Sequence, residues 1–127
     1  MYIAWDGERD CVYVEFKGFA TSAEFRSGTM KVIDAIRERS AKSLISDNRR
    51  LEVVTNEDQL WLRDNLVPQA AALGMKRAAL VVAHTGLGKY ASQEILSRLP
   101  TGMFVTRTFD SLDDAKAWIA AENRSGK

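Results

Sequence analysis

The feature that most constrains this chain is an unbroken apolar run in its second half. Residues Ala78 to Ala83 read Ala-Ala-Leu-Val-Val-Ala and directly follow one charged residue, Arg77. A half-exposed strand alternates apolar and polar residues, so a run without alternation predicts a strand that is buried on both faces. Such strands lie inside parallel sheets that helices cover. The run therefore predicts an α/β protein with Arg77–Ala83 as an interior strand.

The rest of the chain alternates predicted strands with predicted helices. Near the N-terminus, the turn dipeptide Asp6-Gly7 separates two stretches rich in β-forming residues, which predicts a hairpin. The later alternation requires crossover connections and a largely parallel sheet. We therefore expect a mixed five-stranded sheet with an antiparallel first strand, and four helices. The predicted strands are Tyr2–Asp6, Cys11–Lys17, Ser43–Asp47, Arg77–Ala83 and Met103–Phe109, and the helices begin at Thr21-Ser22, Thr55-Asn56, Tyr90 and Asp110-Ser111.

Capping signals and a helix breaker refine the predicted helices. Thr21-x-x-Glu24 and Asn56-x-x-Gln59 have the spacing of a capping box, in which two side chains satisfy free amides at a helix start. Pro68 is expected to kink or end the second helix, because it lacks an amide hydrogen and its ring clashes with the preceding turn. The buried residues expected in the last helix are Leu112, Ala115, Trp118 and Ile119.

Composition narrows the classes of function. The length of 127 residues suits one domain, and 18 Lys+Arg against 17 Asp+Glu leave a net charge of +1, too little to attract nucleic acid. One Cys and one His are too few for a structural zinc site, and one Cys forms no internal disulfide. We find no basic leader and no apolar run of membrane-spanning length. We expect one domain over residues 1–127, in the cytoplasm, with no metal, cofactor, nucleic-acid partner or membrane span.

Three stretches, spread over nearly the whole chain, carry a family resemblance. The first is Leu44-Ile45-Ser46-Asp47, and the second is Glu57-Asp58-Gln59-Leu60-Trp61-Leu62, followed by Pro68 and Lys76-Arg77-Ala78-Ala79. The third is Phe109-Asp110-Ser111-Leu112-Asp113-Asp114-Ala115-Lys116-Ala117-Trp118-Ile119. With the element order, they resemble the STAS domain of bacterial anti-sigma-factor antagonists. The closer resemblance is to small stand-alone bacterial proteins related to SpoIIAA and compared with lipid-carrying SEC14 domains, which implies a single-domain SpoIIAA-like (STAS) fold.

One stretch departs from that family. Antagonists of the family carry Asp-Ser-Ser-Gly before their second helix, where a kinase phosphorylates a Ser. The corresponding residues here are Thr55-Asn56-Glu57-Asp58, without Ser or Gly. A phosphate on Thr55 would meet a favourable helix dipole but also the like charges of Glu57 and Asp58. We therefore expect no phosphorylation switch, and expect Thr55 or Asn56 to cap the helix.

Polar candidates follow the ends of predicted strands. Asp47 and His84 each end a strand, so neighbouring strands would place an acid beside a base, and a structural hydrogen bond is the stronger expectation for such a pair. Arg49 and Arg50 follow in a predicted loop. Adjacent arginines can clamp a phosphate or carboxylate, and a solvated loop is the alternative. With Lys89, these residues form the best local basic patch.

The glycine-containing stretch Gly86-Leu87-Gly88-Lys89 lies between a strand and a helix, where phosphate-binding loops occur. It is expected to be a loop. Ala83 replaces the first glycine of the phosphate-loop pattern, and Tyr90 replaces the hydroxyl residue that binds Mg²⁺. We therefore expect no binding of ATP or GTP, although a simple anion remains an alternative at this helix start.

An apolar pocket beside Pro68 is the other candidate site. Trp61 is expected either to line this pocket or to belong to the core, with core the stronger expectation. Tyr90, Met75 and Met103 are expected to add to the pocket if it forms.

These observations predict a non-enzymatic STAS-like protein that binds a small apolar or amphipathic ligand or a protein partner; a homodimer is left open. The alternative is a protein-interaction module of a bacterial signalling pathway that lacks the usual phosphorylatable Ser. A third alternative is an enzyme that uses Asp47 and His84. We predict no catalytic residue, and the candidate ligand-binding residues are Asp47, Arg49, Arg50, Trp61, His84, Lys89 and Tyr90.

Overall fold

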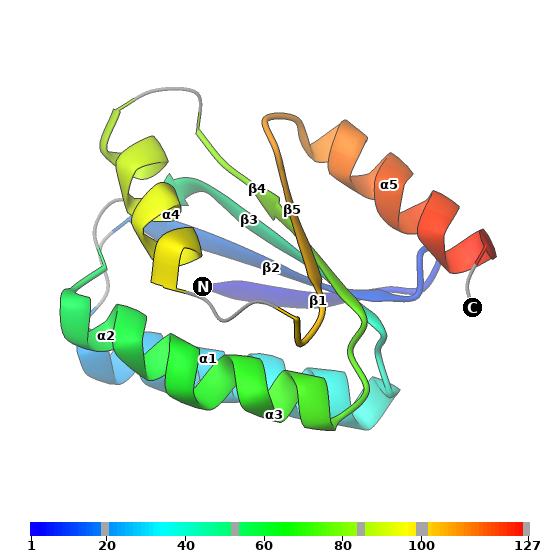
Figure 1. Ribbon diagram of the computed structural model, residues 1–127, viewed down its shortest axis with the longest axis horizontal. Helices are drawn as coiled ribbons and strands as arrows, with labels where there is room; N and C mark the ends of the chain where they lie inside the picture. Colours follow the sequence, from blue (N-terminus) through cyan, green and yellow to red (C-terminus); the bar gives the residue numbers. More distant parts are fainter. Residues whose placement is uncertain (19–20, 52–53, 84–85, 99–101, 126–127) are drawn as a thin grey trace.

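Five strands form one mixed sheet in the computed structural model, which describes residues 1–18, 21–51, 54–83, 86–98 and 102–125 (Figure 1). The strands lie side by side in chain order. β1 is antiparallel to β2, and the other neighbouring pairs are parallel. The predicted hairpin and mixed sheet are therefore confirmed. The strands are β1 (Tyr2–Asp6), β2 (Cys11–Gly18), β3 (Ser43–Leu51), β4 (Arg77–Val81) and β5 (Val105–Phe109).

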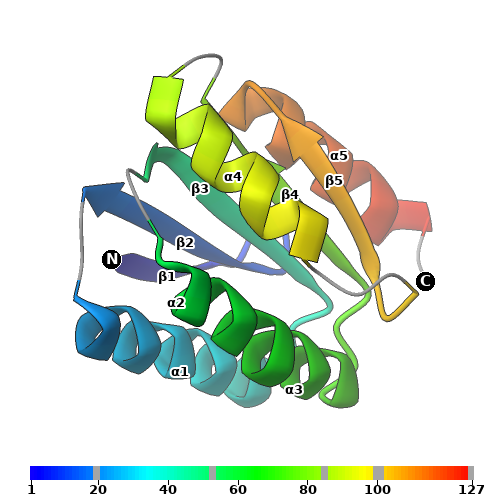
Figure 2. The same cartoon turned by 60° about the vertical axis from the view of Figure 1, so that its left-hand side comes forward.

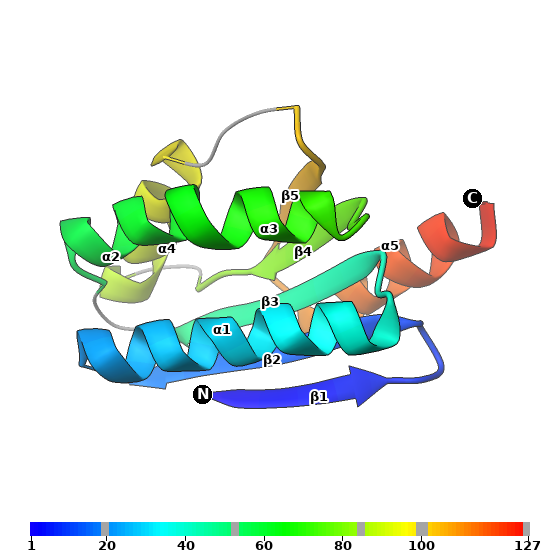
Figure 3. The ribbon, with the colours of Figure 1, turned by 90° about the horizontal axis from the view of Figure 1, so that it is seen from below.

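Helices cover both faces of this sheet (Figures 2 and 3). The three helices that connect parallel strands pack on one face, as crossovers of one hand between strands in chain order require. The helix after β5 packs on the opposite face. In the described ranges these are the four predicted helices. They are α1 (Ser22–Arg39), α2 (Asn56–Trp61) continued by the π-helical turn η1 (Leu62–Leu66) and α3 (Val67–Ala72), α4 (Gly86–Arg98), and α5 (Leu112–Ser125).

β4 is an interior strand, as the apolar run predicts. It pairs with β3 on one side and β5 on the other, and all five of its residues are buried. Ala78 belongs to the core cluster under α1 and α3, whereas Ala79 and Val81 belong to the cluster under α5. The strand ends at Val81, two residues before the end of the predicted run.

The start of α1 matches its prediction in detail. The Glu24 amide donates to Thr21 Oγ1 at 3.2 Å, and the Thr21 amide donates to Glu24 Oε1 at 3.0 Å, so both halves of the capping box are present. One face of the helix is buried against the sheet. Its buried residues are Phe25, Thr29, Val32, Ile33 and Ile36.

The second helix confirms part of its prediction and corrects part of it. Thr55, one of the two expected caps, is the N-cap, and its Oγ1 accepts from the Asp58 amide, whereas the expected box between Asn56 and Gln59 is wrong. Of the two effects expected of Pro68, a kink or an end of the helix, the end does not occur. The turn before Pro68 widens to a π-helix, in which the Val67 amide donates to the Leu62 carbonyl five residues earlier. The wider turn accommodates the proline ring, and the chain continues into α3.

Two predicted loops are parts of regular elements. β3 extends through Asp47, Arg49 and Arg50 to Leu51, because β2 continues to pair with it past a bulge after Glu15. α4 starts at Gly86, not Tyr90, so the glycine stretch forms its first turn. Glycine in a helix costs only about 1 kcal/mol relative to alanine, which the rest of the helix offsets.

Candidate functional site

An apolar cavity of about 80 Å³ lies between the sheet and the helices α1, α2–α3 and α4. We call it the apolar pocket. β3, β4 and β5 supply its floor, and the helices supply its walls. Three lining residues, Ser46, Asn48 and Thr106, are polar, and the others are apolar: Phe16, Phe25, Leu44, Leu51, Leu62, Leu66, Val67, Met75, Ala78, Leu80, Ile95 and Phe104.

The π-helical turn shapes one wall of the apolar pocket. Leu62 and Leu66 stand at the two ends of η1, and Val67 follows at once, so the widened turn brings three lining side chains together. The Asn65 side-chain amide donates to the Trp61 carbonyl at 3.0 Å, which supports the irregular backbone. Single π-turns inside helices occur frequently at functional sites.

A polar pair interrupts the apolar lining. Ser46 and Asn48 lie two residues apart on one face of β3, and their exposed fractions are 6% and 5%. The Ser46 hydroxyl donates to Asn48 Oδ1 at 2.8 Å. This bond orients the amide, whose nitrogen has two donors of its own. No described residue accepts a hydrogen bond from that nitrogen. The pocket therefore combines an apolar interior with an amide donor available to a ligand.

Asp47 lies on the opposite face of the sheet. Its carboxylate accepts from Arg49 Nε at 2.9 Å, from Arg49 Nη2 at 2.7 Å and from the Tyr13 hydroxyl at 3.3 Å. Burial acts to raise the pKa of Asp47, but the bonds and charge of Arg49 outweigh it and hold that pKa below its usual value. Burial, together with the Asp47 charge, raises the pKa of Tyr13 to about 12. Asp47 is thus an ionised partner of Arg49, and His84 falls outside the described residues.

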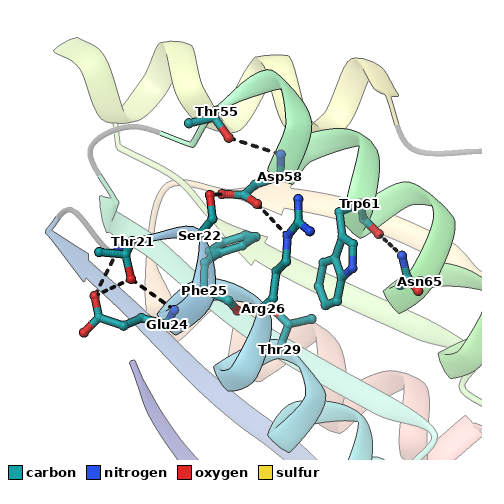
Figure 4. Close-up of polar contacts among 10 residues, drawn as sticks. All are labelled: Thr21, Ser22, Glu24, Phe25, Arg26, Thr29, Thr55, Asp58, Trp61 and Asn65. Atoms are coloured by element: carbon teal, nitrogen blue, oxygen red, sulfur yellow. Dashed lines mark hydrogen bonds and ion pairs between the residues drawn. The ribbon is translucent and has the colours of Figure 1, made fainter.

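A buried carboxylate joins the first turns of α1 and α2 (Figure 4). Asp58, with a side chain only 4% exposed, accepts from Ser22 Oγ at 2.8 Å and from Arg26 Nε at 2.9 Å. The Arg26 guanidinium in turn lies over the Trp61 ring, 5.5 Å from its centroid. This cluster ties together α1 and α2–α3, two of the helical segments that wall the apolar pocket. It leaves neither carboxylate oxygen without a partner.

The structure does not gather the predicted site residues into one site. Asp47 and Arg49 pair on the α5 face, whereas Trp61 contacts Arg26 on the other face and does not line the apolar pocket. Arg50 is exposed, as are Lys89 and Tyr90 on α4. Of the methionines expected to add to the pocket, Met75 lines it and Met103 is exposed.

Sequence reasoning missed Ser46, Asn48, Arg26 and Asp58. Ser46 and Asn48 had a detectable signal, since they are polar residues at alternate positions around Asp47 that directly follow the apolar pair Leu44-Ile45. The pairing of Arg26 with Asp58 gives no such signal in the sequence, because the two residues are distant in the chain and lie on different helices.

Comparison with known proteins finds no matching family model, curated protein or solved structure. Among the described helices, none is long and apolar enough to cross a membrane. In the same part of the chain, no three His, Cys, Asp or Glu side chains lie together as potential metal ligands.

Proposed function

We propose that this chain is a SpoIIAA-like, STAS-type protein that binds a small, mainly apolar molecule in the apolar pocket and catalyses no reaction. The observation that carries the proposal is the Ser46–Asn48 pair within an otherwise apolar cavity. The order of strands and helices and the mixed sheet support the family assignment. The ligand expected here is amphipathic, with one hydrogen-bond acceptor that faces the Asn48 amide.

The size of the cavity limits what it holds. An apolar cavity of about 150 Å³ admits benzene, so 80 Å³ suits only a few non-hydrogen atoms. A longer ligand would have to extend past a half-buried lining residue, and these are Phe16 on β2, Leu66 on η1, and Phe104 and Thr106 on the β5 side of the sheet. The two on the β5 side lie two residues apart in the sequence, which favours an exit there. We therefore propose that the acceptor group of the ligand lies inside the apolar pocket and that any longer chain extends to the β5 edge.

A cavity-filling variant tests this function. Ala78→Leu adds three carbons to the pocket floor, whereas Ala72→Leu makes the same change at an exposed position. Titration with 2-octanone, a linear ketone whose chain can extend out of the cavity, is followed by ¹H–¹⁵N NMR and is expected to give saturable shifts in the wild type and in the Ala72 variant. The Ala78 variant is expected to bind at least about tenfold more weakly, a difference of about 1.4 kcal/mol. Equal binding by all three proteins contradicts the proposal.

The second candidate function is a protein-interaction module of a signalling pathway. Val105 on the edge strand β5 is 60% exposed, and the neighbouring Met103 is 47% exposed. An edge strand with exposed apolar side chains is a template for pairing with another chain. Val105→Lys would abolish a partner complex or a dimer at this edge and leave 2-octanone binding unchanged. Sedimentation analysis of the wild type and of the Val105 variant shows whether the complex or dimer is lost.

A further inference from the structure

Arg77 is a buried cation at the start of β4. It is 9% exposed, and its Nη1 donates to Ser43 Oγ at 2.9 Å and to Asn123 Oδ1 at 2.8 Å. Ser43 Oγ also donates to Asn123 Oδ1 at 3.0 Å, and the Asn123 amide donates to the Arg9 carbonyl. These neutral partners fix the guanidinium in place without supplying a negative charge.

The guanidinium of Arg77 has donors to spare. Of its five N–H groups, those on Nε and Nη2 have no acceptor among the residues that the structure describes. It forms no ion pair with a carboxylate in those same ranges. Burial of an unpaired charge is costly, so buried charges are normally paired. An anion that reaches Arg77 would supply both the missing charge and the missing acceptors.

Arg77 lines a cavity of about 400 Å³, which we call the basic pocket. Three lining side chains are cationic, Arg39, Lys42 and Arg77, against one carboxylate, that of Asp10. The Arg39 guanidinium is held over the Trp5 ring, 5.3 Å from its centroid. The lining residues come from the β1–β2 turn, the end of α1 and the later part of α5, among other segments. These three segments lie towards the right of Figures 1 and 3.

We propose that the basic pocket binds a small organic anion, with its carboxylate or phosphate group on Arg77 and with Arg39 and Lys42 at the rim. Arg77 offers a preformed fork of donors, the geometry that carboxylate and phosphate oxygens accept. The cavity volume is in the range of small-molecule sites and leaves room for more than a bare ion. Trp5 and Ala41 supply apolar surface for the rest of the ligand. This site lies apart from the apolar pocket, and the two share no lining residue.

The test is an NMR titration at constant ionic strength with four probes: phenyl phosphate, inorganic phosphate, benzoate and benzyl alcohol. Saturable shifts of the Lys42 and Arg77 backbone amides are expected with phenyl phosphate or benzoate, and weaker ones with inorganic phosphate. Benzyl alcohol, which is neutral, is expected to cause none. The tighter of phenyl phosphate and benzoate identifies the anionic group. Failure of both to shift these amides, or an equal effect of benzyl alcohol, overturns the proposal.

Substitutions of exposed residues test the proposal even if the Arg77 variant does not fold. Arg39→Gln and Lys42→Gln are each expected to weaken the tighter anion about threefold, a modest effect because both charges are exposed. Arg63→Gln, on the exposed side of η1, is the control and is expected to leave affinity unchanged. Arg77→Met is expected to abolish binding if circular dichroism shows a folded protein. Affinity that is insensitive to both rim substitutions overturns the proposal even if the Arg77 variant unfolds.

Discussion

The Ser46 hydroxyl donates a hydrogen bond to Asn48 Oδ1 at 2.8 Å, inside a cavity whose other walls are mainly apolar. The bond occupies the amide oxygen and leaves the amide nitrogen free of acceptors from the described residues. Ser46 therefore positions Asn48, and Asn48 presents the donor. A pair buried only for stability would be expected to satisfy all of its polar atoms.

A single substitution at this pair should lower the free energy of unfolding, whereas the double substitution should not. Ser46→Ala removes one partner and leaves the buried Asn48 oxygen unsatisfied, so we expect it to lower the free energy of unfolding by about 1–3 kcal/mol. Replacing both residues, with Ser46→Ala and Asn48→Leu together, removes every unpaired polar group and should be neutral or stabilising. Urea denaturation of the three proteins measures both effects. A double variant less stable than Ser46→Ala would contradict this account of the pair.

The ion pair between Arg26 and Asp58 should stabilise the protein more than the ion pair between Arg37 and Asp34, which lies within α1. Arg26→Met leaves the buried Asp58 carboxylate with Ser22 alone, and we expect a loss of about 1–3 kcal/mol. Arg37 bonds to Asp34 at the same 2.9 Å, but both side chains are exposed. Arg37→Met should therefore cost no more than about 0.5 kcal/mol. Thermal unfolding of the two variants makes the comparison, and equal losses would mean that the Asp58 cluster does not hold α1 to α2.

Asp47 should contribute to acid denaturation. Its pKa is held below the ordinary value of 3.8, mainly because the bonds from Arg49 outweigh burial. The unfolded chain therefore takes up this proton first as pH falls. The stability that Asp47 contributes is present above the ordinary pKa and is lost as pH falls towards the pKa of the folded state. Asp47→Asn should flatten the fall in unfolding free energy below about pH 4, while Asp113→Asn, at an exposed position, serves as the control. Parallel pH profiles for wild type and Asp47→Asn would exclude this linkage.

The docking of α5 should depend more on Ile119 than on Trp118. Trp118 is half-buried, not fully buried as predicted, and packs against Phe109 with ring centroids 5.6 Å apart. Ile119 is 0% exposed. We expect Ile119→Ala to cost about 2–5 kcal/mol, and Trp118→Ala to cost less than the 3–5 kcal/mol typical of a fully buried Trp. Urea denaturation midpoints of the two variants measure these losses. A larger loss for Trp118→Ala than for Ile119→Ala would show that α5 docks through Trp118.

Much of the fold could be predicted because local patterns encode it. The unbroken run from Ala78 places β4 inside the sheet, the Asp6-Gly7 dipeptide sets the hairpin, and Thr21 with Glu24 sets the start of α1. Each of these features depends on residues close together in the chain.

The pockets could not be predicted in the same way. Asp47 and Trp61 were grouped as site candidates, yet the sheet separates them, because alternate residues of β3 point to opposite faces. The length of β3 past Asp47 depends on its pairing with β2, and the π-turn before Pro68 depends on how the helix relieves a clash. Arg77 meets Ser43 and Asn123 only after folding. Such contacts are set by tertiary structure, which a one-dimensional pattern does not contain.

The most direct test of the proposed function is the ¹⁵N side-chain amide signal of Asn48 during titration with 2-octanone, assigned with the Asn48→Leu variant. An acceptor bound in the apolar pocket should shift that signal in a saturable way, together with the methyl signals of Leu62 and Ile95, which line the same cavity. Saturable 2-octanone binding that leaves the Asn48 side chain and both methyl signals unmoved, or no binding at all, would contradict the assignment of this pocket as the ligand site.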